Sequence, residues 1–94
     1  MKYAFMSFSC PELTFIEVLT VAQRYGYAGV EPRTDSGHAH GVELATSASE
    51  RALLRRQAGE FGVALCCLAV SCRYADPVAV NAQVDETRHY LDLA

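Results

Sequence analysis

One short pattern occurs twice in this chain: an aromatic residue, a glycine and then the start of an apolar segment. The two copies are Tyr25-Gly26-Tyr27-Ala28 and Phe61-Gly62-Val63-Ala64. A glycine directly after a helical segment is a common helix C-terminus, so each copy marks the end of a helix and the entry to a strand. Strands that alternate with helices in this way predict a parallel sheet joined by right-handed crossovers.

Capping patterns indicate where the helices begin. Two pairs match the S/T-x-x-E signature of a helix N-terminus, Thr14 with Glu17 and Ser47 with Glu50. A third helix is predicted to be capped by Asp76, with Pro77 at its first position. The apolar stripes that should face inward are Phe15, Leu19 and Ala22 in the first helix, Leu54, Ala58 and Phe61 in the second, and Val80, Val84 and Leu91 in the third.

The strands are predicted at 2–8, 27–32 and 63–70, with a long polar loop from Arg33 to about Thr46. Three βα units in 94 residues are about 31 residues each, and eight would make the roughly 250 residues of a (β/α)8 barrel. The predicted fold class is therefore α/β, a (βα)3 parallel-sheet fragment of a TIM barrel, with residues 1–94 as one partial domain. An independent doubly wound domain is disfavoured because neither G-x-G-x-x-G nor a P-loop follows the first strand.

Composition excludes several partner classes. Hydrophobic residues make up 51% of the chain, and the formal net charge of −3 leaves no basic face for nucleic acid or anionic lipid. No apolar run is long enough to span a membrane, and the N-terminal segment does not read as a signal peptide. The four cysteines lack zinc-site spacing and are expected to be buried reduced thiols, although a disulfide stays formally possible. We therefore expect a cytoplasmic protein.

Three segments, "GYAGVEPR", "GHAHG" and "FGVALCCLAVSCRYADP", resemble the N-terminal part of the sugar phosphate isomerase/epimerase family, the xylose-isomerase-like TIM barrels. The resemblance covers essentially the whole chain but only the first three of the family's eight units. It implies proton transfer next to the carbonyl of a small sugar or sugar phosphate. It also implies a divalent metal (Mn, Mg, Zn or Co) held by carboxylates and a histidine from strands four to eight. Those strands are not among these residues, so we expect this chain by itself to be inactive and to hold no metal tightly.

The candidate site residues follow from the barrel, in which chemistry occurs at the C-terminal ends of the strands. They are expected to position the substrate, and no catalytic residue is assigned. The candidates are Ser7, Glu31, Arg33, His38, His40, Ser71 and Arg73. Arg33 and Arg73 could each bind a phosphate or carboxylate, or be ordinary exposed loop arginines.

Glu31 carries the strongest signal among these residues. A strand period of two puts Gly29, Glu31 and Arg33 on one face and Val30 with Pro32 on the other. The apolar pair should face the helices, which leaves Glu31 on the opposite face, at the end of the strand. A carboxylate in that position should bind a sugar hydroxyl, a neighbouring arginine or a metal-bound water; the alternative is a purely structural pair with Arg33 or Arg73.

The motif "GHAHG" leaves three interpretations open. On a strand, an H-x-H pair would direct both imidazoles to one face, as metal sites require. Here His38 and His40 lie in a loop between glycines, and a metal would also need a third ligand. One of the two could instead point into a substrate pocket, or both could belong to a solvated loop.

Two other functions remain as alternatives. The chain could be a truncated, non-catalytic βα module that self-associates, or an endonuclease-type member of the same superfamily, against which the acidic balance argues. Whether the chain is such a self-associating module or part of an isomerase/epimerase, three parallel strands leave open edges and an uncovered sheet face. We therefore predict a homo-oligomer formed through that face or those edges.

Overall fold

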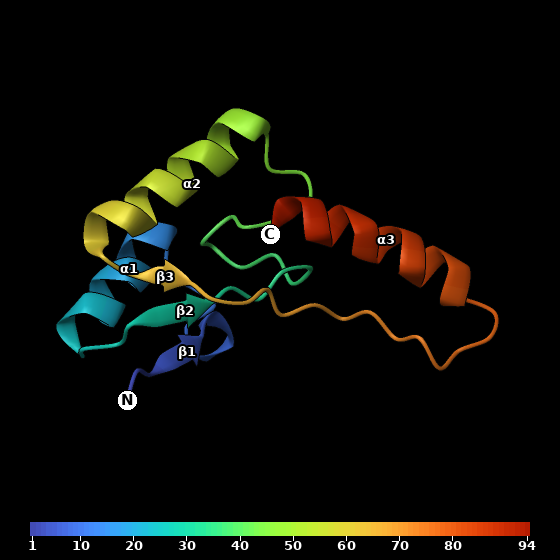
Figure 1. Ribbon diagram of the computed structural model, residues 1–94, viewed down its shortest axis with the longest axis horizontal. Coiled ribbons are helices and arrows are strands. Elements are labelled where there is room, and N and C mark those ends of the chain that lie inside the picture. Colours follow the sequence, from blue (N-terminus) through green and yellow to red (C-terminus); the bar gives the residue numbers. More distant parts are fainter.

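Three parallel strands in the order β1-β2-β3 form the single sheet of the protein, which lies at the opposite side of the molecule from most of α3 (Figure 1). The computed structural model describes all of residues 1–94 as a small α/β domain with three α-helices. The elements are β1 (Ala4–Met6), the 3-10 helix η1 (Ser7–Ser9), α1 (Phe15–Arg24), β2 (Gly29–Glu31), α2 (Ala48–Phe61), β3 (Ala64–Leu65) and α3 (Val80–Leu93). The predicted alternation of strands and helices is thus present, with each strand shorter than predicted.

The first two helices begin where the capping patterns predicted. The Thr14 and Ser47 hydroxyls accept the backbone N–H of Glu17 and Glu50, and each glutamate carboxylate accepts the backbone N–H of its capping residue. Both capping boxes are therefore complete, and each satisfies two backbone donors that a helix start otherwise leaves open.

The repeated aromatic–glycine pattern ends both helices in the same way. Gly26 and Gly62 have φ of 76° and 67°, the left-handed region that side chains other than glycine rarely adopt. The residue after each glycine donates its N–H five residues back, from Tyr27 to Ala22 at 2.8 Å and from Val63 to Ala58 at 3.0 Å. The chain then enters the next strand of the sheet, as predicted.

One face of the sheet is covered by α1 and α2. Val30 is 1% exposed and packs among the buried residues of both helices, so β2 directs Val30 to the helices and Glu31 to the opposite face. The predicted stripes of these two helices are confirmed: the core includes Phe15, Leu19, Ala22 and Ala58, with Leu54 and Phe61 packed against it.

The third strand is interrupted, which corrects the prediction of a continuous strand over 63–70. The Cys66 N–H bonds to the Val30 carbonyl at 3.2 Å, and pairing resumes where the Ala69 N–H bonds to the Pro32 carbonyl at 3.0 Å. Between these two hydrogen bonds the third strand advances three residues, from Cys66 to Ala69, while β2 and the residue after it advance two, from Val30 to Pro32. One extra residue is therefore accommodated as a bulge, after which only an isolated bridge pairs Arg33 with Ala69.

The third helix differs from its prediction in both its start and its buried face. It begins at Val80 without a side-chain cap, because the Asp76 carboxylate instead accepts the N–H of Val78 in a turn ahead of the helix. Val84 and Leu91 were predicted to face inward but are 40% and 69% exposed, whereas Tyr90 is 6% exposed. The helix packs through Tyr90 because that side faces the connecting segments rather than the sheet.

No helix in the protein has both the length and the apolar character that crossing a bilayer requires.

Candidate functional site

Arg33 joins the ends of all three strands. Its backbone N–H donates to the Ser7 hydroxyl, 2.8 Å away, directly after β1. Its guanidinium donates to the Val70 carbonyl at 3.0 Å and to the Ser71 hydroxyl, beyond β3. Three residues predicted from separate strand ends, Ser7, Arg33 and Ser71, are therefore in direct contact at one edge of the sheet.

These contacts also limit what Arg33 can bind. A third guanidinium N–H donates to the Ser36 hydroxyl at 3.2 Å, so all three guanidinium nitrogens already donate to protein acceptors. The two terminal nitrogens form the fork that would grip a phosphate or carboxylate, and this fork is directed at Val70 and Ser71. Arg33 consequently holds the strand ends together.

Glu31, the last residue of β2, is half-buried on the face opposite the helices, and its position agrees with the period-two prediction. It pairs in register with Met6 at the end of β1. Neither Arg33 nor Arg73 forms an ion pair with it, since the ion pairs of the protein are Arg56–Glu60 and Arg88–Asp85. The Glu31 carboxylate is therefore free to accept hydrogen bonds at the strand end. Its negative charge adds to the effect of burial, which raises the pKa of the nearby Cys66 thiol.

His40 is the most deeply buried ionisable group of the loop that follows β2, at 3% exposed. Its Nδ1 accepts the backbone N–H of Val42 at 3.0 Å, so the neutral ring carries its proton on Nε2, which has no partner. Burial lowers the pKa of His40 and the charge of His38 lowers it further, whereas the Arg33 backbone and Glu43 oppose the shift. Burial thus favours the neutral imidazole, whose Nε2–H lies close enough to the Arg33 backbone to be influenced by it but forms no regular hydrogen bond.

Two more unpartnered polar atoms lie in the same loop. His38 stands edge-on to His40 with ring centroids 5.7 Å apart, and its Nδ1 is buried without a partner. Glu43 accepts the N–H of Asp35 through one carboxylate oxygen at 2.7 Å, while its other oxygen is buried and unpartnered. Because a buried polar atom without a partner costs free energy, each of the three atoms would be stabilised by a water or polar group that reached it.

Glu43 was not among the residues predicted from the sequence. It stands three residues after His40, in "HAHGVE", and the only available signal was a carboxylate close to the histidine pair. Its carboxylate is held by the backbone N–H of Asp35, a residue with a left-handed φ of 59°.

The metal interpretation of the histidine pair has no support in the geometry. No group of three or more His, Cys, Asp or Glu side chains is arranged to hold a metal ion. His38 and His40 lack a third ligand, and His40 uses its Nδ1 for the backbone of Val42. The divalent metal that the family resemblance implies would be held by strands four to eight, and the residues present here offer it no ligand set of their own.

Arg73 lies apart from the other candidates. Its backbone N–H donates to the Gln83 side chain of α3 at 3.0 Å, and no hydrogen bond or ion pair joins its guanidinium to the strand-end cluster. The connecting segment between β3 and α3 follows α3 here, which draws Arg73 toward the helix.

Comparisons with protein-family models, with curated protein sequences and with solved structures found no match to this chain. The candidate site is therefore defined by its geometry. Ser7, Glu31, Arg33 and Ser71 lie at the C-terminal ends of the three strands, next to the loop that carries the unpartnered atoms of His38, His40 and Glu43.

Proposed function

We propose that this chain supplies the substrate-positioning, N-terminal part of a TIM-barrel sugar or sugar phosphate isomerase/epimerase, whose reaction is proton transfer next to a carbonyl. The observation that supports the proposal is the convergence of polar residues from three strand ends at one edge of a parallel sheet. In parallel α/β proteins ligands bind at that edge, because the connecting loops there can differ without disturbing the sheet.

The polar atoms of the site match the hydrogen-bonding capacity of a sugar. Each hydroxyl of a sugar both donates and accepts a hydrogen bond. Glu31 and the free oxygen of Glu43 are acceptors, and His40 Nε2 is a donor. In this proposal these three groups orient the hydroxyls, while Arg33 keeps the strand ends in place.

The proposal gives this chain no role in holding the divalent metal (Mn, Mg, Zn or Co), because its residues do not form a ligand set. When bound to a complete barrel, such a metal would polarise adjacent sugar oxygens. The prediction that the four cysteines are buried was wrong: Cys10 and Cys72 are half-buried, and Cys66 and Cys67 are exposed. The location that we propose is the reducing cytoplasm, where exposed thiols persist without forming disulfides.

Binding of sugars to the purified chain tests the proposal. We expect chemical-shift changes at Glu31, His40 and Glu43 in heteronuclear NMR spectra on titration with millimolar aldoses, ketoses and their phosphates. Glu31→Gln should weaken binding, whereas Glu60→Gln, at an exposed glutamate paired with Arg56 on α2, is the matched control. Shift changes that are absent at this edge, or unaffected by Glu31→Gln, would contradict the proposed site.

A second candidate function, a non-catalytic module that self-associates, is favoured by one observation. Several large hydrophobic side chains remain exposed, among them Phe8 at 61% and Leu91 at 69%. Self-association is compatible with either function.

A further inference from the structure

An apolar groove of about 1120 Å3 runs along α2 on the helix-covered side of the sheet. Eleven of its 16 lining residues are hydrophobic, including Leu54 of α2, Leu65 of β3 and Leu68 of the bulge. The last turn of α3 forms one end of the groove through Leu93 and its neighbours. The rest of the groove is covered by no other element of the chain.

The third helix projects from the body of the protein. Figure 1 shows α3 running away from the sheet, with only its C-terminal end near the other elements. The molecule measures 44 × 29 × 24 Å and has a radius of gyration of 13.9 Å, above the roughly 12 Å expected for a compact domain of this length. The helix therefore forms an arm with little of its surface covered by its own chain.

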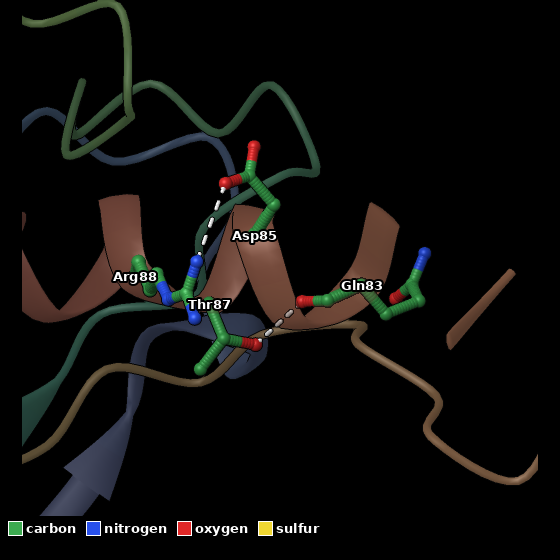
Figure 2. A network of polar contacts seen from close by, with 4 residues as sticks. All are labelled: Gln83, Asp85, Thr87 and Arg88. Carbon is green, nitrogen blue, oxygen red and sulfur yellow. Dashed lines mark hydrogen bonds and ion pairs between the residues drawn. The ribbon is translucent and has the colours of Figure 1, made fainter. Parts of the chain in front are cut away.

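One face of the arm combines exposed apolar residues with a hydrogen-bonded threonine. The connecting segment bonds to Gln83 and Thr87, and Thr87 also donates to the Gln83 carbonyl at 2.8 Å (Figure 2). Val84 and Leu91 are seven residues apart and nearly aligned along the helix, with Thr87 between them on the same face. Both remain exposed hydrophobic residues, at 40% and 69%.

The charges of the arm and the groove are complementary. The groove is bordered by Arg51, Arg55 and Arg56 and by one acid, Asp92 of the chain's own α3. Arg51 bonds to the Thr46 and Leu44 carbonyls and Arg56 pairs with Glu60, so Arg55 is the rim arginine without a partner. The arm carries Asp85, Glu86 and Asp92 against a single cation, Arg88. An acidic amphipathic helix is the kind of element that a basic-rimmed apolar groove accepts.

We infer that a second copy of this chain binds the groove with its α3, and that the exchange is reciprocal. Each copy contributes one arm and one groove, so a two-fold axis closes the assembly after two chains. Val84 and Leu91 of each arm cover the apolar lining of the other groove. This is a different surface from the open sheet face and edges that the sequence suggested.

The chain's own α3 is not the occupant. Tyr90 is 6% exposed and lies beside Thr34 and Asp35, which holds the helix against the loop after β2. To fill its own groove, α3 would have to leave that contact and slide along its axis by much of its length, about 21 Å for its 14 residues. A second copy can occupy the groove while Tyr90 of each chain keeps its contact with the loop after β2 of that chain.

The groove side is tested at Gly59 of α2. This residue lines the groove, and a Cβ placed on it meets nothing within 4 Å. Gly59→Ala and Gly59→Glu both favour the helix, but the glutamate adds bulk and repels the acidic arm. In sedimentation velocity and light scattering of the full chain, we expect dimers for the parent and Gly59→Ala, and a dissociation constant raised about tenfold or more for Gly59→Glu.

The arm side is tested at Leu91. Leu91→Glu should raise the dissociation constant by a similar factor, whereas Val78→Glu, a fully exposed site just ahead of the arm, should leave it unchanged. Circular dichroism of each variant verifies that the fold is kept. A parent chain that stays at 10.3 kDa up to hundreds of micromolar overturns the inference, as does a dimer that resists both glutamate substitutions. Sugar binding is measured separately, so either proposal can fail alone.

Discussion

The first two βα units and the third are built differently, although all three have the same order of elements. α1 and α2 start at complete capping boxes, end at left-handed glycines and bury an apolar stripe against the sheet. α3 starts without a side-chain cap and leaves Val84 and Leu91 exposed. Apart from Leu93, which packs against the core, its contacts are to the connecting segments.

This difference separates two requirements of a packed helix. Caps and glycines act within a few residues, so they define helix ends wherever they occur. Burial of a stripe needs a surface to receive it, and β3 offers little, because its two-residue strand is followed by a bulge. The predictions below probe this contrast.

The largest effect is expected in the shared core of the first two units. Leu19 is fully buried, and Leu19→Ala should lower the free energy of unfolding by about 3 kcal/mol through lost burial and the cavity left behind. Val78→Ala, at a site 94% exposed ahead of α3, is the control and should change nothing measurable. Urea unfolding followed by circular dichroism measures both. Equal losses of unfolding free energy in the two variants would contradict the contrast between the units.

Replacing Gly62, which caps the C-terminus of α2, and Gly59, which lies inside α2, with alanine should change the stability of the protein in opposite directions. Gly62→Ala forces a Cβ into the left-handed region and should cost about 1 to 2 kcal/mol. Gly59→Ala lies inside the helix with open space around it and should stabilise the protein by about 0.5 to 1 kcal/mol. The thermal unfolding midpoint should therefore fall in Gly62→Ala and rise in Gly59→Ala. A shift of the same sign in both variants would mean that α2 does not end at Gly62.

Helix caps should matter in the second unit and not in the third. Ser47→Ala removes the acceptor for the Glu50 N–H and should cost about 1 kcal/mol. Asp76→Ala removes a bond that lies ahead of α3, so it should cost clearly less. Amide hydrogen exchange in the first turn of each helix reports the loss. Faster exchange throughout α3 in Asp76→Ala would show that this turn does support the helix.

The smallest effect at neutral pH comes from His40. Its pKa in the folded chain is lowered, chiefly by burial, so the unfolded chain takes up a proton at higher pH than the folded one. The free energy of unfolding should hold above pH of about 6.5, the ordinary value for histidine, and fall as pH drops below it. His40→Asn retains an acceptor for the Val42 N–H without this titration and should flatten that fall. His89→Asn, on exposed α3, is the control; equal flattening in both would exclude His40 as the cause.

Part of the candidate site could be predicted and part could not. The period of two placed Glu31 on the face away from the helices, because strand geometry is local and regular. The strand-end rule named Ser7, Arg33 and Ser71, which the structure joins. The use of Arg33 as an internal tie and the inward turn of Glu43 were not predictable, since both depend on backbone atoms that are distant in the sequence or bent at Asp35.

By itself, the sequence determined the parallel βα order, the limits of α1 and α2, and the faces of β2, because each depends on interactions within a few residues of the chain. The length of β3, the burial of His40 and the position of α3 were decided only by the tertiary structure. Strand length depends on which neighbour is available for pairing, burial depends on segments brought together from far along the chain, and a helix takes the orientation in which its contacts outweigh the entropy of ordering them.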